Sequence, residues 1–344
     1  MTRPDQTRPD HDLKHALKSL KEFLKRHDRF HILRGIKRII THPIYYFLWG
    51  RDRTFFHSFS KKTYSKVPYV IRRIASDVGL FSYFNTILAG IAYADKNGYI
   101  PVVDMKNYPN TYLFPDEVGR INSWEYYFEQ PGGISLEDAL SSRKYIMSRD
   151  TALHGYPRTM NLASNEDERK YWRELCRKYI RFTRPVLDRV EAMTQKYSGM
   201  KILGVLVRGT DYVAMKPKGH GIPPTAEQAI AKASEIMTEK GFDSVYLATE
   251  DKNILAKFQA AFGEKLLLPE ADYLDYDYDA RKCLSYVSSN RKNDKYLRGM
   301  EYLVSMMFLG KCNGLIGSYN NGTTAALLFS DGFEYLYVFD LGVY

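Results

Sequence analysis

The pattern of apolar and polar positions divides the chain into three regions. From residue 201 onward, short apolar runs alternate with longer segments whose apolar residues recur at helical spacing. The pattern predicts strands at 201–207, 244–248, 265–268, 314–317 and 335–339, and helices at 225–240, 253–262, 296–309 and 323–330. Such alternation is typical of a mostly parallel sheet with helices on both faces.

Residues 67–199 show the same alternation less regularly. The pattern there predicts strands at 67–74, 99–104 and 145–148, and helices at 83–96 and 135–140. Residues 166–197 are predicted to form one long charged helix, or two helices broken near Pro185. Ser198 and Gly199 end that long helix, and a new strand–helix series starts directly after them. We therefore expect two α/β domains, at 67–199 and 200–344.

The first 66 residues form a separate, basic region. Apolar residues from 13 to about 47 recur at helical spacing among Lys and Arg, and an aromatic cluster ends at Trp49. Through Ala75 the chain has 18 Lys and Arg against 6 Asp and Glu, whereas the remainder has 32 against 34. A basic amphipathic arm over 1–66 suits the surface of an anionic membrane, with residues 13–50 as the contact. The alternative is that its apolar face packs on the protein's own body or on a partner subunit.

Composition narrows the classes further. The basicity belongs to the arm and not to the folded domains, so a nucleic-acid partner is not expected. Cys176, Cys283 and Cys312 lie far apart with no paired spacing, which disfavours a disulfide framework or a zinc site and favours a reducing compartment. No apolar run approaches the ~20 residues of a membrane span, and no secretory leader pattern is present. We expect a cytoplasmic protein.

The strand at 201–207 ends in Arg208-Gly209-Thr210-Asp211. Ligands of open α/β sheets bind beyond the carboxyl ends of the strands, and an arginine there presents a fork of donors suited to phosphate oxygens. Gly209 allows close approach of the backbone, and Thr210 and Asp211 can hold the turn. The alternative is an Arg–Asp surface pair closing a tight turn.

Two further strands end in polar residues. Thr249-Glu250-Asp251 follows the strand at 244–248, where a carboxylate could bind a ribose or base, although Asp251 could equally cap the next helix. Ser318 to Thr324 follows the strand at 314–317, and its glycine-bearing helix start suits a diphosphate. Three polar ends in one sheet predict a common crevice. Aromatic and amide residues at 124–130 could line a sugar subsite or pack as an ordinary loop.

These motifs resemble the fucosyltransferase superfamily, most closely the α1,6-fucosyltransferases. The resemblance covers about 67–340 and rests on Leu206-Val-Arg208-Gly-Thr-Asp211, on Tyr246 to Asp251, on Leu297-Arg298-Gly299 and on Gly317 to Asn321. The turn at Gly79 and the segment from Pro101 to Asp104 resemble the first βαβ unit of the same fold. The resemblance implies a GT-B fold of two Rossmann-like domains. It also implies an inverting, metal-independent fucosyltransferase with GDP-fucose as its donor and a saccharide acceptor.

The resemblance also implies roles for particular residues. Arg208 corresponds to the arginine that binds the donor diphosphate, and the other expected donor-binding residues are Gly79, Gly209, Thr210, Thr249, Glu250, Asp251, Arg298, Ser318, Tyr319, Asn320, Asn321 and Thr323. The candidate catalytic bases are Asp77, Glu129, Asp211 and His220. We expect no metal or other cofactor. The expected acceptor is an oligosaccharide, in one form a lipid-linked saccharide for a surface polysaccharide.

The chain departs from the family motif at two positions. Leu206 replaces the motif histidine and Gly209 its second arginine, and Glu301 is the nearest match to the family's guanine-binding aspartate. Three alternatives follow: a transferase for another nucleotide sugar, a catalytically inactive sugar-binding scaffold, and a metal-dependent GT-A transferase using the carboxylates of Asp275, Asp277 and Asp279.

Overall fold

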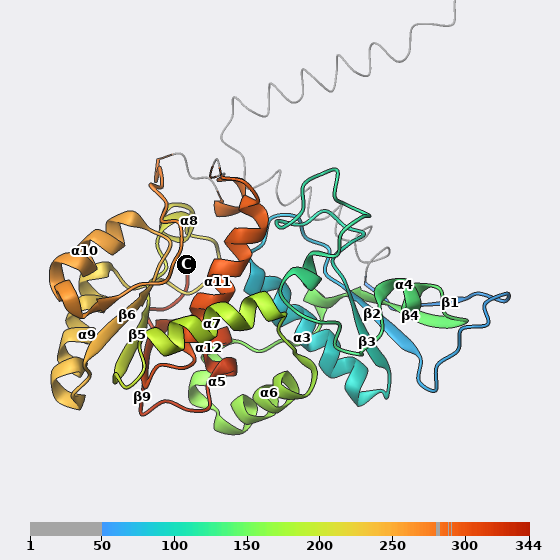
Figure 1. The fold of residues 1–344 in the computed structure, drawn as a ribbon, viewed down its shortest axis with the longest axis horizontal. Coiled ribbons are helices and arrows are strands. Elements are labelled where there is room, and N and C mark those ends of the chain that lie inside the picture. The colour runs from blue at the N-terminus through green and yellow to red at the C-terminus, as the bar shows by residue number, and fades with distance from the viewer. Residues whose placement is uncertain (1–49, 280–282, 288, 290) are drawn as a thin grey trace, which may run out of the picture. The chain divides into compact units, whose positions relative to one another are not determined.

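The computed structural model describes residues 50–279, 283–287, 289 and 291–344 (Figure 1). The predicted helices of the basic arm lie outside these residues. One compact unit extends from Asp52 to Tyr344, and it contains two separate sheets. Within the described residues, no helix is both long enough and apolar enough to cross a membrane.

The first sheet has four strands in the order β1 (Arg53–Phe56), β4 (Lys144–Asp150), β2 (Pro68–Arg72) and β3 (Ile100–Asp104). β2 is parallel to β3 and β4, and only β1 runs antiparallel, at the edge. Side chains alternate between its faces: Val70 and Val102 pack towards α4 (Leu136–Leu140), whereas Ile71 and Val103 pack towards α3 (Leu80–Lys96). β1 brings residues assigned to the arm into the folded unit.

The second sheet is fully parallel. Its order is β7 (Leu266–Leu267), β6 (Ser244–Ala248), β5 (Ile202–Leu206), β8 (Gly314–Ser318) and β9 (Tyr335–Phe339). One face packs on α9 (Ala226–Lys240) and α10 (Lys252–Phe262), and the other on α11 (Asp294–Leu309) and α12 (Asn321–Phe329). The connections run from β5 outward to β7 and then return to β8, so the point of reversal lies between β5 and β8, where open α/β sheets bind ligands.

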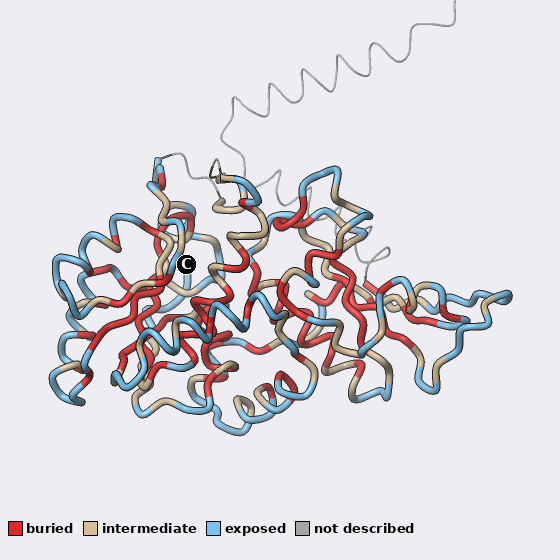
Figure 2. Tube along the Cα trace, in the orientation of Figure 1, coloured by how far each residue is buried: buried red, intermediate tan, exposed pale blue. Residues whose placement is uncertain are grey.

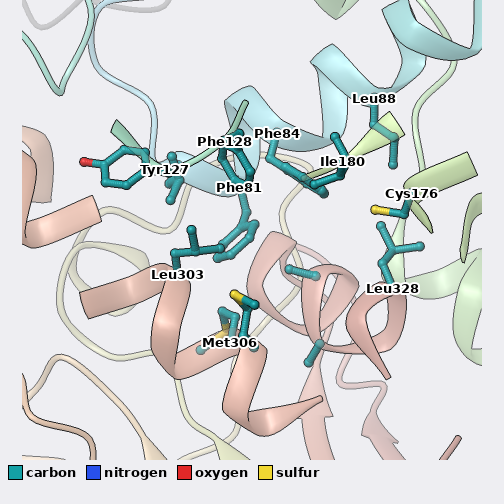
Figure 3. Close-up of a cluster of buried hydrophobic side chains, with 14 of the residues drawn as sticks. Phe81, Phe84, Leu88, Tyr127, Phe128, Cys176, Ile180, Leu303, Met306 and Leu328 are labelled. Carbon is teal, nitrogen blue, oxygen red and sulfur yellow. The ribbon is translucent and has the colours of Figure 1, made fainter. Parts of the chain in front are cut away.

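The two sheets share one core. Phe81, Phe84 and Leu88 of α3 face Leu303 and Met306 of α11 and Leu328 of α12 (Figure 3). The Phe81 ring lies 5.0 Å from that of Tyr302, and the Phe84 ring lies 5.5 Å from that of Phe329. Burial follows this layout, with most red segments lying inside the strands and these central helices (Figure 2).

Three helices that precede residue 200 pack on the second half of the chain. These are α5 (Thr159–Ser164), α6 (Glu166–Tyr179) and α7 (Arg184–Lys196); α5 and α6 contact α12, and α7 contacts α11. Pro185 lies in the first turn of α7, where its missing N–H costs nothing, and the chain breaks before it as expected. The expected α/β class with two mostly parallel sheets is confirmed, while the boundary at 199 and 200 stays a prediction.

Two local features go beyond the sequence pattern. Between β5 and α9, where the pattern predicts no element, Thr210–Met215 form the short helix α8. Of the two interpretations of residues 124–130, packing describes Trp124, Tyr127 and Phe128, which are buried in the shared core. The Tyr127 hydroxyl donates to the Tyr296 carbonyl on α11 at 2.9 Å. A Cβ at Gly299 would lie 2.1 Å from that hydroxyl oxygen, so the motif glycine serves this contact.

Candidate functional site

Two adjoining cavities lie at the carboxyl ends of β5, β6 and β8. The strand-end cavity has a volume of about 170 Å³ and is lined by Leu206, Ala248, Thr249 and Glu250 among others. The loop cavity, of about 230 Å³, is lined by Tyr212, His220, Asn320 and Asn321 among others. Both share six lining residues: Asp77, Gly79, Arg208, Asp211, Cys283 and Tyr302. The loops after β2 and β5 therefore meet at one continuous crevice.

Arg208 lies at the centre of this crevice. Its Nη2 donates to Asp211 Oδ1 at 3.0 Å, its Nε lies 3.6 Å from Glu250 Oε1, and its guanidinium lies 4.7 Å from the centre of the Tyr212 ring. Burial lowers the pKa of Arg208, but the charges of Glu250 and Asp211 outweigh burial and hold the pKa above its ordinary value. Among the described residues, the buried Nε has no hydrogen-bond acceptor. A fixed, permanently charged fork of donors thus faces both cavities.

The backbone after Arg208 is held in an uncommon conformation. A Cβ at Gly209 would lie 2.5 Å from Asp251 Oδ2 and 2.8 Å from Ile254 Cδ1, so only glycine fits without a shift. Thr210 has a φ of 51°, in the left-handed backbone region that residues other than glycine rarely adopt. Its hydroxyl donates to Glu250 Oε1 at 2.8 Å, which compensates for the strain and orients that carboxylate towards Arg208.

Asp251 is a structural residue. It is fully buried, and its Oδ1 accepts from the backbone of Asn253 at 2.8 Å as the N-cap of α10. Its Oδ2 accepts from Thr210 N at 3.3 Å and from the Tyr278 hydroxyl. The helix-cap interpretation of this residue is therefore the one that the geometry supports, and Asp251, Gly209 and Thr210 support the site without lining its cavities.

The start of α12 is also largely satisfied by its own residues. Asn320 caps the helix by accepting from Thr323 N at 2.9 Å and donates to the Ser318 carbonyl at 3.2 Å. Asn321 accepts from Asn85 of α3 at 3.2 Å. Asn320 and Asn321 line the loop cavity, whereas Ser318, Tyr319 and Thr323 lie outside the lining of both cavities. Of the residues expected to bind the diphosphate at this helix start, Asn320 and Asn321 are thus the two that line a cavity.

A network of charged residues forms one wall of the strand-end cavity. Arg291 binds both oxygens of Glu301, at 2.5 and 2.9 Å, and its Nε donates to Asp294 at 3.0 Å. Arg298 donates to Asp294 at 2.7 Å and to the carbonyls of residues 284 and 287. Arg298 also lines the cavity, and its guanidinium holds the 283–287 segment in place.

Arg291, Asp294 and Tyr302 are crevice residues that the sequence analysis missed. Arg291 and Asp294 lie between the strand predicted at 265–268 and the helix predicted at 296–309, where no element was predicted, although an acidic residue in the first helical turn is a helix-start signal. Tyr302 follows Arg298 by four residues and hence shares its helix face. Burial raises the pKa of Tyr302, so it is a neutral hydroxyl in both cavities.

The four candidate bases differ in position. His220 lines the loop cavity, and its Nδ1 lies 3.2 Å from the Tyr212 hydroxyl. Burial, together with the charge of Arg208, lowers the pKa of His220 below its ordinary value of 6.5. Asp77 is exposed at the boundary of both cavities. Asp211 accepts from Arg208 and from Leu284 N at 3.1 Å, and Glu129 lies outside both linings.

The His220 loop is fixed by a distant segment. Gly219 N donates to the Tyr344 carbonyl at 2.9 Å, and Tyr344 N donates to the His220 carbonyl at 3.0 Å. Residues 342–344 thereby pair with residues 219–222. The imidazole is carried on backbone that is held on both sides.

The carboxylate triplet of the metal-dependent alternative has no metal-like geometry. Asp277 accepts from the backbone of Asp279 at 3.0 Å, which closes a local turn. In the described part of the chain, no group of three or more His, Cys, Asp or Glu side chains is placed to hold a metal ion.

Comparison with known proteins gives matches of structure alone. No family model matches the chain, and no curated protein matches its sequence. A fucosyltransferase NodZ from Bradyrhizobium is 16% identical, with a TM-score of 0.47, over 80% of this chain and 96% of that one. A NodZ α-1,6-fucosyltransferase soaked with GDP-fucose is 17% identical, with a TM-score of 0.44, over 77% and 93% of the two chains.

A third similar structure is that of POFUT1 in complex with GDP-fucose. It is 10% identical, with a TM-score of 0.43, and the match covers 82% of this chain and all of that one. The two NodZ structures are named as fucosyltransferases. At such low identities and TM-scores, the likeness carries no inference about what this chain binds or does.

Proposed function

We propose that the protein is a glycosyltransferase that transfers fucose from GDP-fucose to a saccharide acceptor, with inversion and without a metal ion. The observation that carries the proposal is Arg208, a fixed guanidinium at the carboxyl end of β5 that lines both cavities. Its Nε is buried 3.6 Å from Glu250 Oε1, beyond hydrogen-bonding distance, so a shift of the guanidinium towards a ligand oxygen gives up no hydrogen bond at this atom. The motif resemblance supplies the identity of the donor.

Arg208 binds the donor's diphosphate in this proposal. The strand-end cavity takes the nucleoside, because its lining offers acceptors on Glu250 and Glu301 and donors on Arg291. Asn320 and Asn321 offer amide groups to the phosphates or the sugar from the loop cavity. The two carboxylates beside Arg208 keep its fork in one orientation, which reduces the ordering that binding must impose.

The reaction proposed is a direct displacement at the anomeric carbon. A base removes the proton from the acceptor hydroxyl, whose oxygen attacks the anomeric carbon from the face opposite the diphosphate. The bond from that carbon to the phosphate oxygen breaks, and its electron pair leaves with GDP. Arg208 stabilises the charge that develops on the leaving oxygen, a contribution that such fixed donors commonly make.

His220 is the base that we assign. Its lowered pKa keeps the imidazole neutral near pH 7, so it can accept a proton, and the pairing of residues 219–222 with 342–344 holds it at the loop cavity. Asp77 is the second candidate, because it is exposed and lines both cavities. Asp211 is engaged by Arg208 and Leu284, so we assign it the role of orienting the guanidinium.

Two observations favour the alternative of a binding protein without catalysis. Gly209 stands where the family motif has its second arginine, and Arg208 is already paired with carboxylates. Detection of free GDP and fucose from GDP-fucose, or of a fucosylated product, separates the enzyme from the scaffold. A retained anomeric configuration in the product would contradict the inverting mechanism.

A thermal-shift screen with GDP, UDP, ADP and CMP tests the donor class. A ligand at 100 times its Kd adds ~2.7 kcal/mol to the free energy of unfolding. We expect GDP to give the largest shift in the parent and a much smaller one in Arg208→Ala. A larger shift with another nucleotide would reassign the donor, and no shift with any of the four would remove the proposal.

We also propose that the protein acts at the cytoplasmic face of a membrane on a lipid-linked saccharide. The support is the charge asymmetry of the sequence, with the basic residues concentrated before residue 76. An anionic surface attracts such a segment by ~1 kcal/mol per basic residue near it. The arm would keep the crevice beside an acceptor that cannot leave the bilayer.

A further inference from the structure

An exposed aromatic turn includes the last two residues of the edge strand β1 and the four residues after it. Phe55, Phe56 and Phe59 expose 39%, 70% and essentially all of their side chains, within five residues of sequence. Single exposed apolar residues are normal on protein surfaces, but a cluster of large ones is a mark of an interaction site. We call residues 55–60 the aromatic turn. In Figure 1 it lies in the blue segment that projects from the four-stranded sheet beside β1, and Figure 2 colours this segment as exposed.

The aromatic turn is ordered by hydrogen bonds. Ser60 N donates to the His57 carbonyl at 3.1 Å, which closes a tight turn with Phe59 near its apex. His57 N donates to the Arg143 carbonyl at 2.9 Å, and Arg143 N donates to the Lys62 carbonyl at 2.7 Å. The Ser60 hydroxyl donates to the Ser141 carbonyl at 2.6 Å. These bonds hold the phenyl rings outward, so little conformational entropy is lost when they enter a new environment.

Basic side chains surround the aromatic turn. Residues 52–66 contain one acidic residue, Asp52, and four basic ones, and Arg143 and Lys144 lie on the neighbouring strand segment. Two carboxylates at this surface are paired, Asp138 with Lys62 and Glu137 with Lys106. The surplus of positive charge therefore comes from Lys61, Lys66, Arg143 and Lys144. The ammonium of Lys144 lies 5.7 Å from the centre of the Phe56 ring. Apolar rings at an apex with cations behind them complement a bilayer whose acyl region lies beneath anionic headgroups.

We propose that the aromatic turn inserts into the interface of an anionic lipid membrane, with Phe56 and Phe59 among the acyl chains and the basic residues at the lipid phosphates. Two features favour a membrane as the partner: the positive charge beside the rings matches anionic headgroups, and the turn is already formed before binding. The aromatic cluster of the predicted arm ends at Trp49, four residues before β1 begins in the sequence. The inference does not rest on the proposed transfer reaction, since membrane binding is measured without a donor or an acceptor.

The test measures binding of the full chain to phosphatidylcholine vesicles with and without phosphatidylglycerol. The double variant Phe56→Ser and Phe59→Ser should lower the partition coefficient on the anionic vesicles by about tenfold or more. The control is Tyr171→Ser on α6, which removes an aromatic ring of 51% exposure at a remote site and should bind like the parent. Lys61→Gln with Lys66→Gln should lower binding about fivefold per charge, and less so at high salt.

A probe at the apex separates this surface from the arm. An environment-sensitive fluorophore on Phe59→Cys should shift its emission to the blue on anionic vesicles, with the labelled parent as background because its Cys283 is partly exposed. Unchanged vesicle binding of the double Phe variant would overturn the proposal. So would a fluorophore that stays in water while the protein binds, because the arm alone would then make the contact. Loss of self-association in that variant without any vesicle binding would assign the turn to a second copy of the chain instead.

Discussion

Replacement of Arg208 separates its role in charge balance from its role towards the donor. Arg208→Ala removes the guanidinium and leaves Asp211 and Glu250, whose side chains are 9% and 22% exposed, without their shared counter-charge. Loss of one partner from a partly buried hydrogen-bonded pair costs about 1–3 kcal/mol of stability. Loss of one fixed donor to a developing anion raises the activation barrier by ~3–4 kcal/mol, which lowers turnover about 100- to 1,000-fold.

Arg208→Lys keeps the charge beside both carboxylates but loses the planar fork. We expect it to unfold close to the parent temperature, whereas Arg208→Ala unfolds at a lower one. Both variants should lose about 100-fold or more of their turnover, because a point charge cannot replace two oriented donors. Arg208→Ala combined with Glu250→Gln should recover stability without recovering turnover.

The assays are thermal unfolding and release of GDP from GDP-fucose at saturating donor. If Arg208→Lys keeps turnover within about tenfold of the parent, the fork is not what the donor requires, and the magnitude assigned to it is wrong. If Arg208→Ala keeps full activity, Arg208 is only the partner of its two carboxylates.

Four other outcomes are expected. Gly209→Ala should lower the free energy of unfolding by about 1–3 kcal/mol, since its Cβ would meet Asp251 Oδ2 at 2.5 Å; unchanged unfolding in denaturant would show that the turn can relax. Asp251→Ala should cost about 2 kcal/mol or more by removing a helix cap and leaving Thr210 N without its acceptor, measured in the same way. The transfer rate should fall as the pH drops through the pKa of His220, with a midpoint below 6.5 because the charged imidazolium is disfavoured there. His220→Asn should abolish this acidic fall of the pH–rate profile. If the fall persists in that variant, the group that titrates is Asp77 or another residue. Deletion of residues 1–50 should move protein from the membrane to the soluble fraction, with the weaker binding of the aromatic turn remaining, while activity on a soluble acceptor persists. An unfolded product would show that the arm belongs to the core.

Most regular elements could be predicted because their periodicity reports burial directly. The apolar run at 244–248 predicts the strand found there. The helix that ends at Lys240 is followed by Gly241, whose φ of 65° is the left-handed conformation typical of a helix-ending glycine. β1 escaped prediction because most of its side chains are exposed, so its apolar residues show no buried face. Helix α8 escaped because six residues are too short for a period to register.

The site could be predicted only in part because sequence gives chemistry but not partners. Arg208 is recognisable from its place at a strand end, and the structure adds the two carboxylates that fix it. Asp251 carries the same carboxylate as Glu250, yet one caps a helix in the interior and the other lines a cavity. That difference depends on the path of the backbone through Gly209, which no local pattern encodes.

The shared core of α3, α11 and α12 limits how the crevice can open. Rotation of one sheet away from the other would separate the Phe81 and Tyr302 rings and the Phe84 and Phe329 rings, and would expose this aromatic surface to water. Displacement of residues 283–287 would break their hydrogen bonds to Arg298 and Asp211, and displacement of residues 219–222 would break those to residues 342–344. Neither displacement would expose this aromatic surface. Substrate entry should therefore occur by loop opening in a body that stays rigid, and neither half expressed alone should fold into a stable protein.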